Sequence, residues 1–318
     1  MSNKPSQMYG GQAVVEGVMF GGRNYSVTAI RRKNNNIEYY ELPNRESTPL
    51  KVLKKIPFLR GIIALIQSAA NGSKHLNFST ERFDVEPEEE PQQEESNTVN
   101  LTMIVGVALV GVLSLIFGKV LFTALPAFLA DILFGKLVPN QFFNNLIEGA
   151  IKILILFGYI MAISQAPFIK RLFQYHGAEH KVINAYEAGE ELTVNNVRRY
   201  SRYHYRCGSS FMILTVIIGV IIYSLFNYYI SPYESIWDRV LQRLALIPVV
   251  VGVSYEALRL TNRVRNIAVL KGLGVPGVWL QYLTTKEPDN AQIEVSIAAF
   301  KRMSELDSNK NPAVASLR

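Results

Sequence analysis

Four long apolar stretches dominate the pattern of hydrophobic and polar positions along the chain. The first runs from Asn100 to Ala130 and contains a single charged residue, Lys119. A helix needs about 20 apolar residues to cross the hydrocarbon core of a bilayer. We therefore predict a mainly α-helical membrane protein in which residues 100–260 form a four-helix transmembrane bundle. The three later stretches cover residues 142–164, 208–230 and 241–258.

Residues 8–43 follow a different pattern, in which apolar and polar positions alternate as they do in half-buried strands. The segments QAVVEGVMF, YSVTAIRR and IEYYEL are rich in β-branched and aromatic residues, and GGRN and KNNN separate them as turns. The pattern predicts a small antiparallel sheet within residues 1–45. A sheet of this size cannot bury a core alone, so it should pack against another part of the protein.

Residues 46–82 have helical periodicity around Ile62, Ile63 and Ile66, but Arg60 interrupts the apolar run. We expect an amphipathic helix at the membrane face here, and not a fifth span. Residues 83–99 are acidic, rich in Pro and Gln and almost without apolar side chains, which predicts a disordered linker.

The tail, residues 261–318, is expected to be helical with a Gly/Pro break. Pro288 and Asp289 are start signals for its last helix, and Ile293, Ile297 and Phe300 form the apolar stripe of that helix.

Lys and Arg are distributed unevenly around the predicted spans. Twelve precede the first span, seven lie in the loop 166–207 and nine follow from Arg259, whereas the loops 127–141 and 231–243 hold one and two. This bias predicts a multi-pass protein with both termini and the loop 166–207 in the cytoplasm. Anionic lipid beside the positive flanks accounts for the net charge of +7, so we expect the lipid bilayer as a partner and no nucleic acid.

No apolar run opens the chain, so no cleavable signal peptide is expected. The single cysteine, Cys207, excludes an internal disulfide and fits a reducing compartment.

The loop 166–207 contains the pattern H-x-x-E-H at His176, Glu179 and His180. On a helix, two histidines four residues apart lie on one face and can bind one zinc ion. The glutamate would then serve as the catalytic general base. The alternative is an interfacial polar helix whose histidines form hydrogen bonds with backbone or headgroups.

A metal site needs a third protein ligand, and the candidates are Cys207, at the start of the third span, and Glu256, near the end of the fourth. Each has a structural alternative: Cys207 as a small buried residue, and Glu256 as the partner of an interfacial arginine. Three further residues on the same predicted face could surround the site or bind a ligand, namely Glu16, His204 and Arg206.

Glu148 and Lys152 stand four residues apart in the second predicted span. Ionisable residues at membrane depth are expensive and are usually paired. We interpret them as a structural ion pair that locks the bundle, with a polar path through the membrane as the alternative.

Several segments resemble the DUF1385 family of bacterial membrane proteins. They are GGQAVVEGVMF, RGIIALIQSAANG, YHGAEHKVINAYEAGEELTVNNVRRYSRYHYRCGSSF, SYEALRL and LQYLTTKEPDNAQIEVSIAAF. The similarity covers nearly the whole chain in order. It implies a bacterial inner-membrane protein and a metal-dependent enzyme, which supports the assignment of His176, Glu179 and His180 but names no substrate. Two departures, Phe20 and Tyr205, fall on residues outside the proposed ligands.

Three classes of function stay open. The first is a zinc-dependent hydrolase at the cytoplasmic membrane face, acting on a lipid-linked molecule or a membrane-protein segment. The second is a scaffold or quality-control adaptor for membrane proteins, in which the polar cluster is structural. The third is a small transporter or channel, for which four spans per chain would require a homo-oligomer.

Overall fold

The computed structural model describes residues 9–44, 52–83, 85, 113–114, 116–118, 120–138, 140–205, 207–232, 236–264 and 275–309. Within these residues the protein is mainly helical, with one small antiparallel sheet near the N-terminus, which confirms that part of the predicted fold class. Several predicted segments lie outside the described residues: residues 86–99 of the linker, residues 100–112 of the first span, and residues 265–274 and 310–318 of the tail, which include part of its predicted Gly/Pro break.

The sheet has four antiparallel strands, whereas the alternation of apolar residues predicts three. The first predicted strand is divided by a tight turn at Val15 and Glu16, and Glu16 has a φ of 50°, which few non-glycine residues adopt. The turn lacks the usual Asn-Gly or Asp-Gly pair, so the apolar pattern runs through it without a break. The strands are β1 (Gly10–Val14), β2 (Gly17–Gly21), β3 (Tyr25–Arg31) and β4 (Ile37–Pro43).

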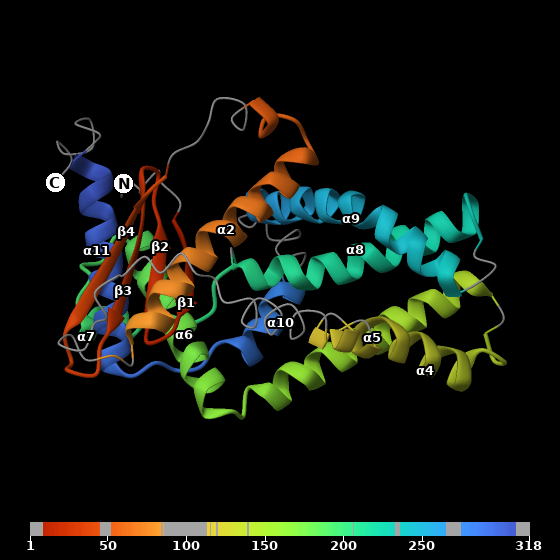
Figure 1. The fold of residues 1–318 in the computed structure, drawn as a ribbon, viewed down its shortest axis with the longest axis horizontal. Coiled ribbons are helices and arrows are strands. Elements are labelled where there is room, and N and C mark those ends of the chain that lie inside the picture. Colours follow the sequence, from red (N-terminus) through yellow and green to blue (C-terminus); the bar gives the residue numbers. More distant parts are fainter. Residues whose placement is uncertain are drawn as a thin grey trace, which may run out of the picture.

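Helices cover both faces of the sheet (Figure 1). Along β3, Val27 and Ala29 point into the main core against α6 (Pro167–Glu187) and α11 (Asn290–Asn309), whereas Ile30 belongs to a smaller cluster under α2 (Leu59–Arg82). The sheet therefore obtains its core from helices that flank it, as its small size requires.

The last helix begins where the sequence predicts. The Asp289 carboxylate accepts a hydrogen bond from the Gln292 N–H at 2.8 Å, and the Gln292 side chain accepts one from the Asp289 N–H at 3.0 Å. This reciprocal pair caps the helix. The predicted stripe of Ile293, Ile297 and Phe300 is buried, chiefly against the sheet and α6.

In the part of the chain that the structure describes, four helices are long and apolar enough to cross a membrane, as predicted. The candidate spans are Ile116–Phe134, Phe142–Ile163, Gly208–Tyr229 and Trp237–Thr261. They coincide with η2 (Val120–Ala124) and α4 (Leu125–Phe134), α5 (Gln141–Ile163), α8 (Gly208–Tyr229) and α9 (Ile236–Val264). The orientation of the termini stays a prediction.

The sheet lies at one end of this bundle (Figure 1). Three residues separate the end of α5 from the start of α6, and the segment after α6 contains α7 (Val194–Val197) before Cys207 leads into α8. Helix α10 (Val275–Thr284) packs against α8 and α5. The loop between the second and third spans is therefore brought against the sheet and α10, and the candidate site lies at this junction.

Candidate metal centre

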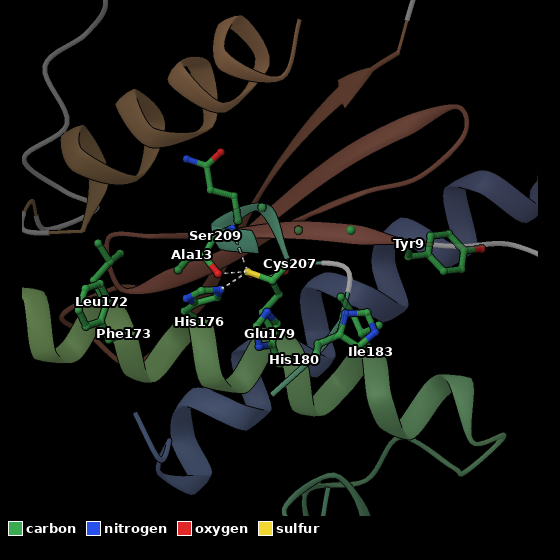
Figure 2. Close-up of a pocket in the computed structure, with 15 residues that line it drawn as sticks. Tyr9, Ala13, Leu172, Phe173, His176, Glu179, His180, Ile183, Cys207 and Ser209 are labelled. Atoms are coloured by element: carbon green, nitrogen blue, oxygen red, sulfur yellow. Dashed lines mark hydrogen bonds between the residues drawn. The ribbon is translucent and has the colours of Figure 1, made fainter. Parts of the chain in front are cut away.

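His176, His180 and Cys207 come together where α6 meets the start of α8. The two histidines are one helical turn apart on α6, and their ring centroids are 4.5 Å apart. Cys207 is the N-cap of α8. One potential ligand atom from each residue lies within 4.8 Å of the other two. Figure 2 shows the His176 ring next to the Cys207 sulfur in the space between α6 and β1.

Backbone carbonyls orient both imidazole rings. The Nδ1 atom of His176 is 2.8 Å from the Thr284 carbonyl, and that of His180 is 2.6 Å from the Arg202 carbonyl. A carbonyl can only accept, so Nδ1 carries the proton in each ring and Nε2 has a free lone pair. Metal-bound histidines are usually held in this way by their second nitrogen.

The two Nε2 atoms differ in what they contact. His176 Nε2 is 3.1 Å from the Cys207 sulfur. His180 is 1% exposed, and its Nε2 makes no hydrogen bond of normal geometry, although it is near enough to the Cys207 sulfur to lower the pKa of that thiol. A buried nitrogen without a partner is costly, and a metal ion between the three residues would satisfy it. Two imidazoles and one thiolate are a donor set suited to zinc.

Burial and neighbouring groups favour the metal-binding protonation states. Burial lowers the pKa of His180, which keeps the ring neutral. Burial alone raises the pKa of the Cys207 thiol, but interactions with His180 and Ser209 outweigh it and leave that pKa below its ordinary value. Neutral imidazole and thiolate are the forms that bind metals.

Glu179 lies beside the three residues without being one of the converging group. It is 5% exposed and, among the described residues, makes no ion pair. Burial raises its pKa to about 8, although His176 and the Gly11 N–H, which donates a hydrogen bond to it, act in the opposite direction. A pKa near neutrality suits a group that accepts a proton and later returns it.

Two glycines allow the surrounding backbone to approach the site. A Cβ atom at Gly11 would lie 3.0 Å from the Glu179 side chain and 2.6 Å from the Met19 carbonyl. A Cβ atom at Gly177 would lie 2.1 Å from the Lys286 carbonyl. The absence of side chains at these positions lets β1 cover Glu179 and lets Lys286, just after α10, approach α6, which brings the Thr284 carbonyl at the end of α10 to His176.

Gln281, which the sequence patterns do not identify, holds the loop that carries Arg202 and Cys207. Its side chain is fully buried, and it accepts a hydrogen bond from the His204 N–H and donates one to the His204 carbonyl, both at 2.8 Å. Because Gln281 and Thr284 are both on α10, one helix positions the partners of both rings. A buried amide that pairs with a loop backbone has no local sequence signature.

A cavity of about 290 Å³ lies beside the cluster, between β1, α6 and the start of α8. Its walls also include Leu172 and Phe173 from α6 and the glycine-rich start of β1 (Figure 2). The three converging side chains and Glu179 all contribute to the lining. The cavity therefore leaves room for a small group next to the cluster.

Glu256, the other predicted ligand, does not lie in this cluster. The Arg60 guanidinium on α2 binds both of its carboxylate oxygens, and the Phe58 N–H donates to it at 3.3 Å. The ion pair connects α2 to α9, and it corresponds to the structural alternative for Glu256, with Arg60 as the interfacial arginine.

The other predicted site residues lie at different distances from the cluster. Glu16 pairs with Arg171 and accepts a hydrogen bond from the Tyr175 hydroxyl at 3.1 Å, one residue before His176 on α6. His204 lines the cavity, with its ring centroid 5.8 Å from that of His180. Arg206 lies outside the described residues.

Glu148 and Lys152 lie in another part of the bundle, where both line a second cavity. Glu148 forms ion pairs with Arg239 and Arg243 of α9. The structure thus adds two arginines to this region, and the proposed pair between Glu148 and Lys152 stays a prediction.

Comparisons with known proteins agree on one family. The profile described as "Protein of unknown function (DUF1385)" matches residues 56–306. The chain is also 50% identical over 308 residues to "Uncharacterized protein YqhQ" of Bacillus subtilis (strain 168), which covers 96% of this chain and 95% of that protein. No solved structure matches the chain. Neither description names a reaction, a substrate or a metal.

Proposed function

The chain belongs to the DUF1385 family, and we propose that it is a metal-dependent membrane enzyme whose ion is bound by His176, His180 and Cys207. The observation that carries the proposal is the pair of anchored rings. Both Nδ1 atoms are held by carbonyls, and His180 Nε2 is buried beside Cys207 without a hydrogen-bond partner. Histidines that only pack in a core do not require their ring nitrogens to point toward one another and toward a cysteine sulfur.

Zinc is the ion that this donor set favours. Catalytic zinc sites have three protein ligands and keep one position open, whereas structural sites are closed by four. Three residues converge here beside a cavity. Copper sites with two histidines and one cysteine usually have an axial methionine, and no methionine is among the described residues that line this cavity.

The reaction class that fits best is hydrolysis. A bound zinc ion supplies Lewis acidity and lowers the pKa of water. Glu179 is placed to take a proton from a water molecule in the cavity and to give it to a leaving group, because its pKa of about 8 allows both states near neutral pH. The Gly11 N–H holds the carboxylate in position through its hydrogen bond.

The position of the cavity suggests the substrate class. Cys207 immediately precedes the candidate span Gly208–Tyr229, so the cluster lies where the bundle would leave the membrane. Leu172 and Phe173 supply an apolar wall. A lipid-linked molecule or a segment of a membrane protein can reach such a site from the bilayer, and the charge bias of the loops supports a cytoplasmic location for it.

The test is the metal content of the full-length protein purified in detergent, measured by inductively coupled plasma mass spectrometry. Wild type should contain about one zinc ion per chain, and His176→Ala/His180→Ala should contain none. His204→Ala is the matched control, because His204 is a buried neighbour outside the converging group. It should keep its metal.

Cobalt substitution tests the third ligand. Wild type reconstituted with cobalt should show thiolate-to-cobalt charge-transfer absorption, and Cys207→Ser should lose it. A well-folded wild type that binds no metal after reconstitution would rule the proposal out. Equal metal loss in His204→Ala and in the double variant would also argue against it, because that outcome indicates a general disturbance of the junction.

A structural scaffold is the second candidate function, and the Glu16–Arg171 pair favours it. In this hypothesis the polar cluster fastens the sheet to the bundle, as Glu16 does through Arg171 and Tyr175. A closed metal site or no metal at all would then be expected. Metal that cannot exchange with a chelator without unfolding the protein would support the scaffold over the enzyme.

A further inference from the structure

The first strand of the sheet, β1, has one edge that pairs with no strand in the described part of the chain. The strand order is β1-β2-β3-β4, so β1 pairs only with β2. The cavity beside the metal centre follows the other edge, because residues 10–13 of β1 contribute to its lining. Figure 2 shows Ala13, the His176 ring and the Cys207 sulfur around this space. The edge and the proposed ligands therefore border the same cavity.

The geometry of the hairpin determines which backbone groups of β1 point away from β2. Val14 and Gly17 flank the two-residue turn, and the pair that closes such a turn is hydrogen-bonded. Because successive residues alternate in direction, the N–H and C=O groups of Gly11 and Ala13 point outward. The Gly11 N–H agrees, since it donates to Glu179 in the cavity lining. No described residue outside the sheet forms a hydrogen bond with the Ala13 backbone.

The opposite edge of the sheet, on β4, is protected against pairing with another chain. Strand β4 ends in Pro43, and its Glu38 and Glu41 form ion pairs with arginines. Charged side chains and proline are common means of blocking an exposed edge. Strand β1 has the sequence GGQAV, which contains neither a charge nor a proline. The edge that borders the cavity is therefore the one that can accept a further strand.

The space beside β1 is open to a second backbone. Gly10 is exposed, and a Cβ atom placed on it would have no described atom within 4 Å. The same is true of Gly208, which lines the cavity at the start of α8. Glycines allow close approach of another backbone, and an added strand lies about 4.8 Å from its neighbour. Leu172 and Phe173 are half-buried and supply an apolar wall for a side chain of that strand.

We infer that the outer edge of β1 binds an extended polypeptide segment as an additional strand, which passes beside the metal centre. A polypeptide presents N–H and C=O groups in the alternation that the Ala13 backbone requires. A lipid does not present these groups in alternation along a chain. Of the two substrate classes that fit the position of the cavity, the edge therefore favours a segment of a membrane protein. That this segment is a substrate rests on the proposed function, whereas its binding to β1 does not.

The experiment measures the fluorescence anisotropy of labelled peptides added to the full-length protein in dodecyl maltoside. The probes are four heptapeptides in which threonine alternates with valine, leucine, phenylalanine or alanine. Each carries fluorescein at its N-terminus and an amide at its C-terminus, and empty micelles correct for partition into the detergent. At least one peptide should bind in a saturable manner, both to protein treated with a chelator and to protein loaded with zinc.

Methyl groups on the peptide nitrogens test whether the peptide binds as a strand. Alternate N–H groups of a strand point to opposite edges, so only one set can face β1. Methylation of that set should weaken binding about tenfold or more, because it removes the hydrogen bonds to β1. Methylation of the other set should weaken binding much less. The comparison requires no change in the protein.

Ala13→Pro removes the outward N–H group from β1 itself. Proline is tolerated at an edge position whose N–H group does not belong to the ladder, so the hairpin should still form. The peptide should bind about tenfold more weakly. Ala13→Ser is the matched control, because it keeps the N–H group at the same position, and it should bind the peptide as wild type does. If Ala13→Pro fails to fold, the methylated peptides still test the inference.

The outcomes separate this inference from the proposed function. If no peptide binds, or if both methylated sets bind equally well, the edge does not accept a peptide strand and the inference is wrong, whatever the metal content. Equal losses in Ala13→Ser and Ala13→Pro would also overturn it. So would a dimer, seen by light scattering, that Ala13→Pro abolishes, because the edge would then pair with a second copy. A protein that binds the peptide but no zinc would support the β1 site and reject the metal centre.

Discussion

Helices α2 and α6 are both long helices that pack against the sheet and bear buried histidines, yet their polar residues do different things. On α2, Arg60 pairs with Glu256, and the His75 Nδ1 lies 2.7 Å from the Thr28 hydroxyl of β3. Each contact joins one polar group to one partner. On α6, His176 and His180 converge on Cys207. Separate pairs of side chains attach α2 to its neighbours, whereas on α6 two histidines and the facing cysteine lie around one point.

The comparison contrasts a core histidine, His75, with a proposed ligand, His180. His75 and His180 are both buried, and each has an Nε2 atom without a hydrogen-bond partner. His75 does not belong to a cluster of ligand residues among the described part of the chain, whereas His180 has two other ligand atoms within 4.8 Å. A buried nitrogen without a partner is therefore weak evidence of a metal site. Convergence of several donors is stronger evidence.

The largest effect is expected from Gln281→Ala, which breaks the support behind the α6 cluster without changing a proposed ligand. The loop that carries Arg202 and Cys207 would lose both hydrogen bonds to Gln281. Loss of such supporting contacts typically weakens metal binding about 10- to 100-fold. Competition with a chelator of known affinity measures the change.

Gln292→Ala is the control for that experiment. Gln292 is also fully buried, but among the described residues its side chain forms hydrogen bonds with the Asp289 N–H and the Gln174 side chain of α6, and not with the loop. It should cost about 1 kcal/mol of stability and leave the metal affinity unchanged. An equal loss of affinity in both variants would mean that Gln281 acts only through general stability.

Arg60→Gln tests the pairwise contact on α2 and should have a smaller effect. It removes the guanidinium that binds both carboxylate oxygens of Glu256 and should lower the stability of the protein. The loss should be smaller than for a fully buried pair, because the two side chains keep 25% and 23% exposure. Thermal unfolding measures the loss, and the metal content should not change.

The double variant Arg60→Gln/Glu256→Gln should recover most of the lost stability, because no uncompensated charge remains. If instead Arg60→Gln releases metal, the α2 contact and the α6 cluster are coupled, and the distinction between the two helices fails.

The last prediction concerns the response of protein stability to pH at His75. Burial, with a contribution from Lys74, lowers its pKa to about 4, whereas the unfolded state has an ordinary value of about 6.5. Between these values the unfolded chain binds the proton and the folded protein does not, so stability falls as the pH is lowered from about 6.5 to about 4. The non-titrating variant His75→Gln should lose stability less steeply over this range. Parallel curves would show that His75 is protonated in the folded state.

The sequence predicts the helices and strands of this protein better than it predicts which side chains contact one another. Hydropathy locates the four apolar helices, and alternation locates the sheet, because these patterns report burial directly. The turn at Glu16 is missed because apolar residues flank it on both sides. The spacing of His176 and His180 suggests the site, but a carboxylate such as Glu256 reads the same whether it meets an arginine or a metal.

Contacts between distant segments account for the rest. Gln281 binds His204 across 77 residues, and the Thr284 carbonyl meets His176 across 108. Neither contact produces a periodic pattern in the sequence. The position of a single buried amide or carbonyl depends on how distant helices pack together. Such support is visible only once the helices are placed.

The contacts between the two ends of the chain also set the order in which the protein can mature. Asp307 on α11 accepts hydrogen bonds from the backbone of Arg23, Asn24 and Tyr25, and the longest of these contacts spans 284 residues. The first strands must therefore wait for almost the entire chain to leave the ribosome before they acquire their final cover. Because α10 also emerges late, an incomplete chain would lack the Thr284 carbonyl that orients His176. A chain that ended before α10 would thus have the four apolar helices but would lack the contact that orients His176.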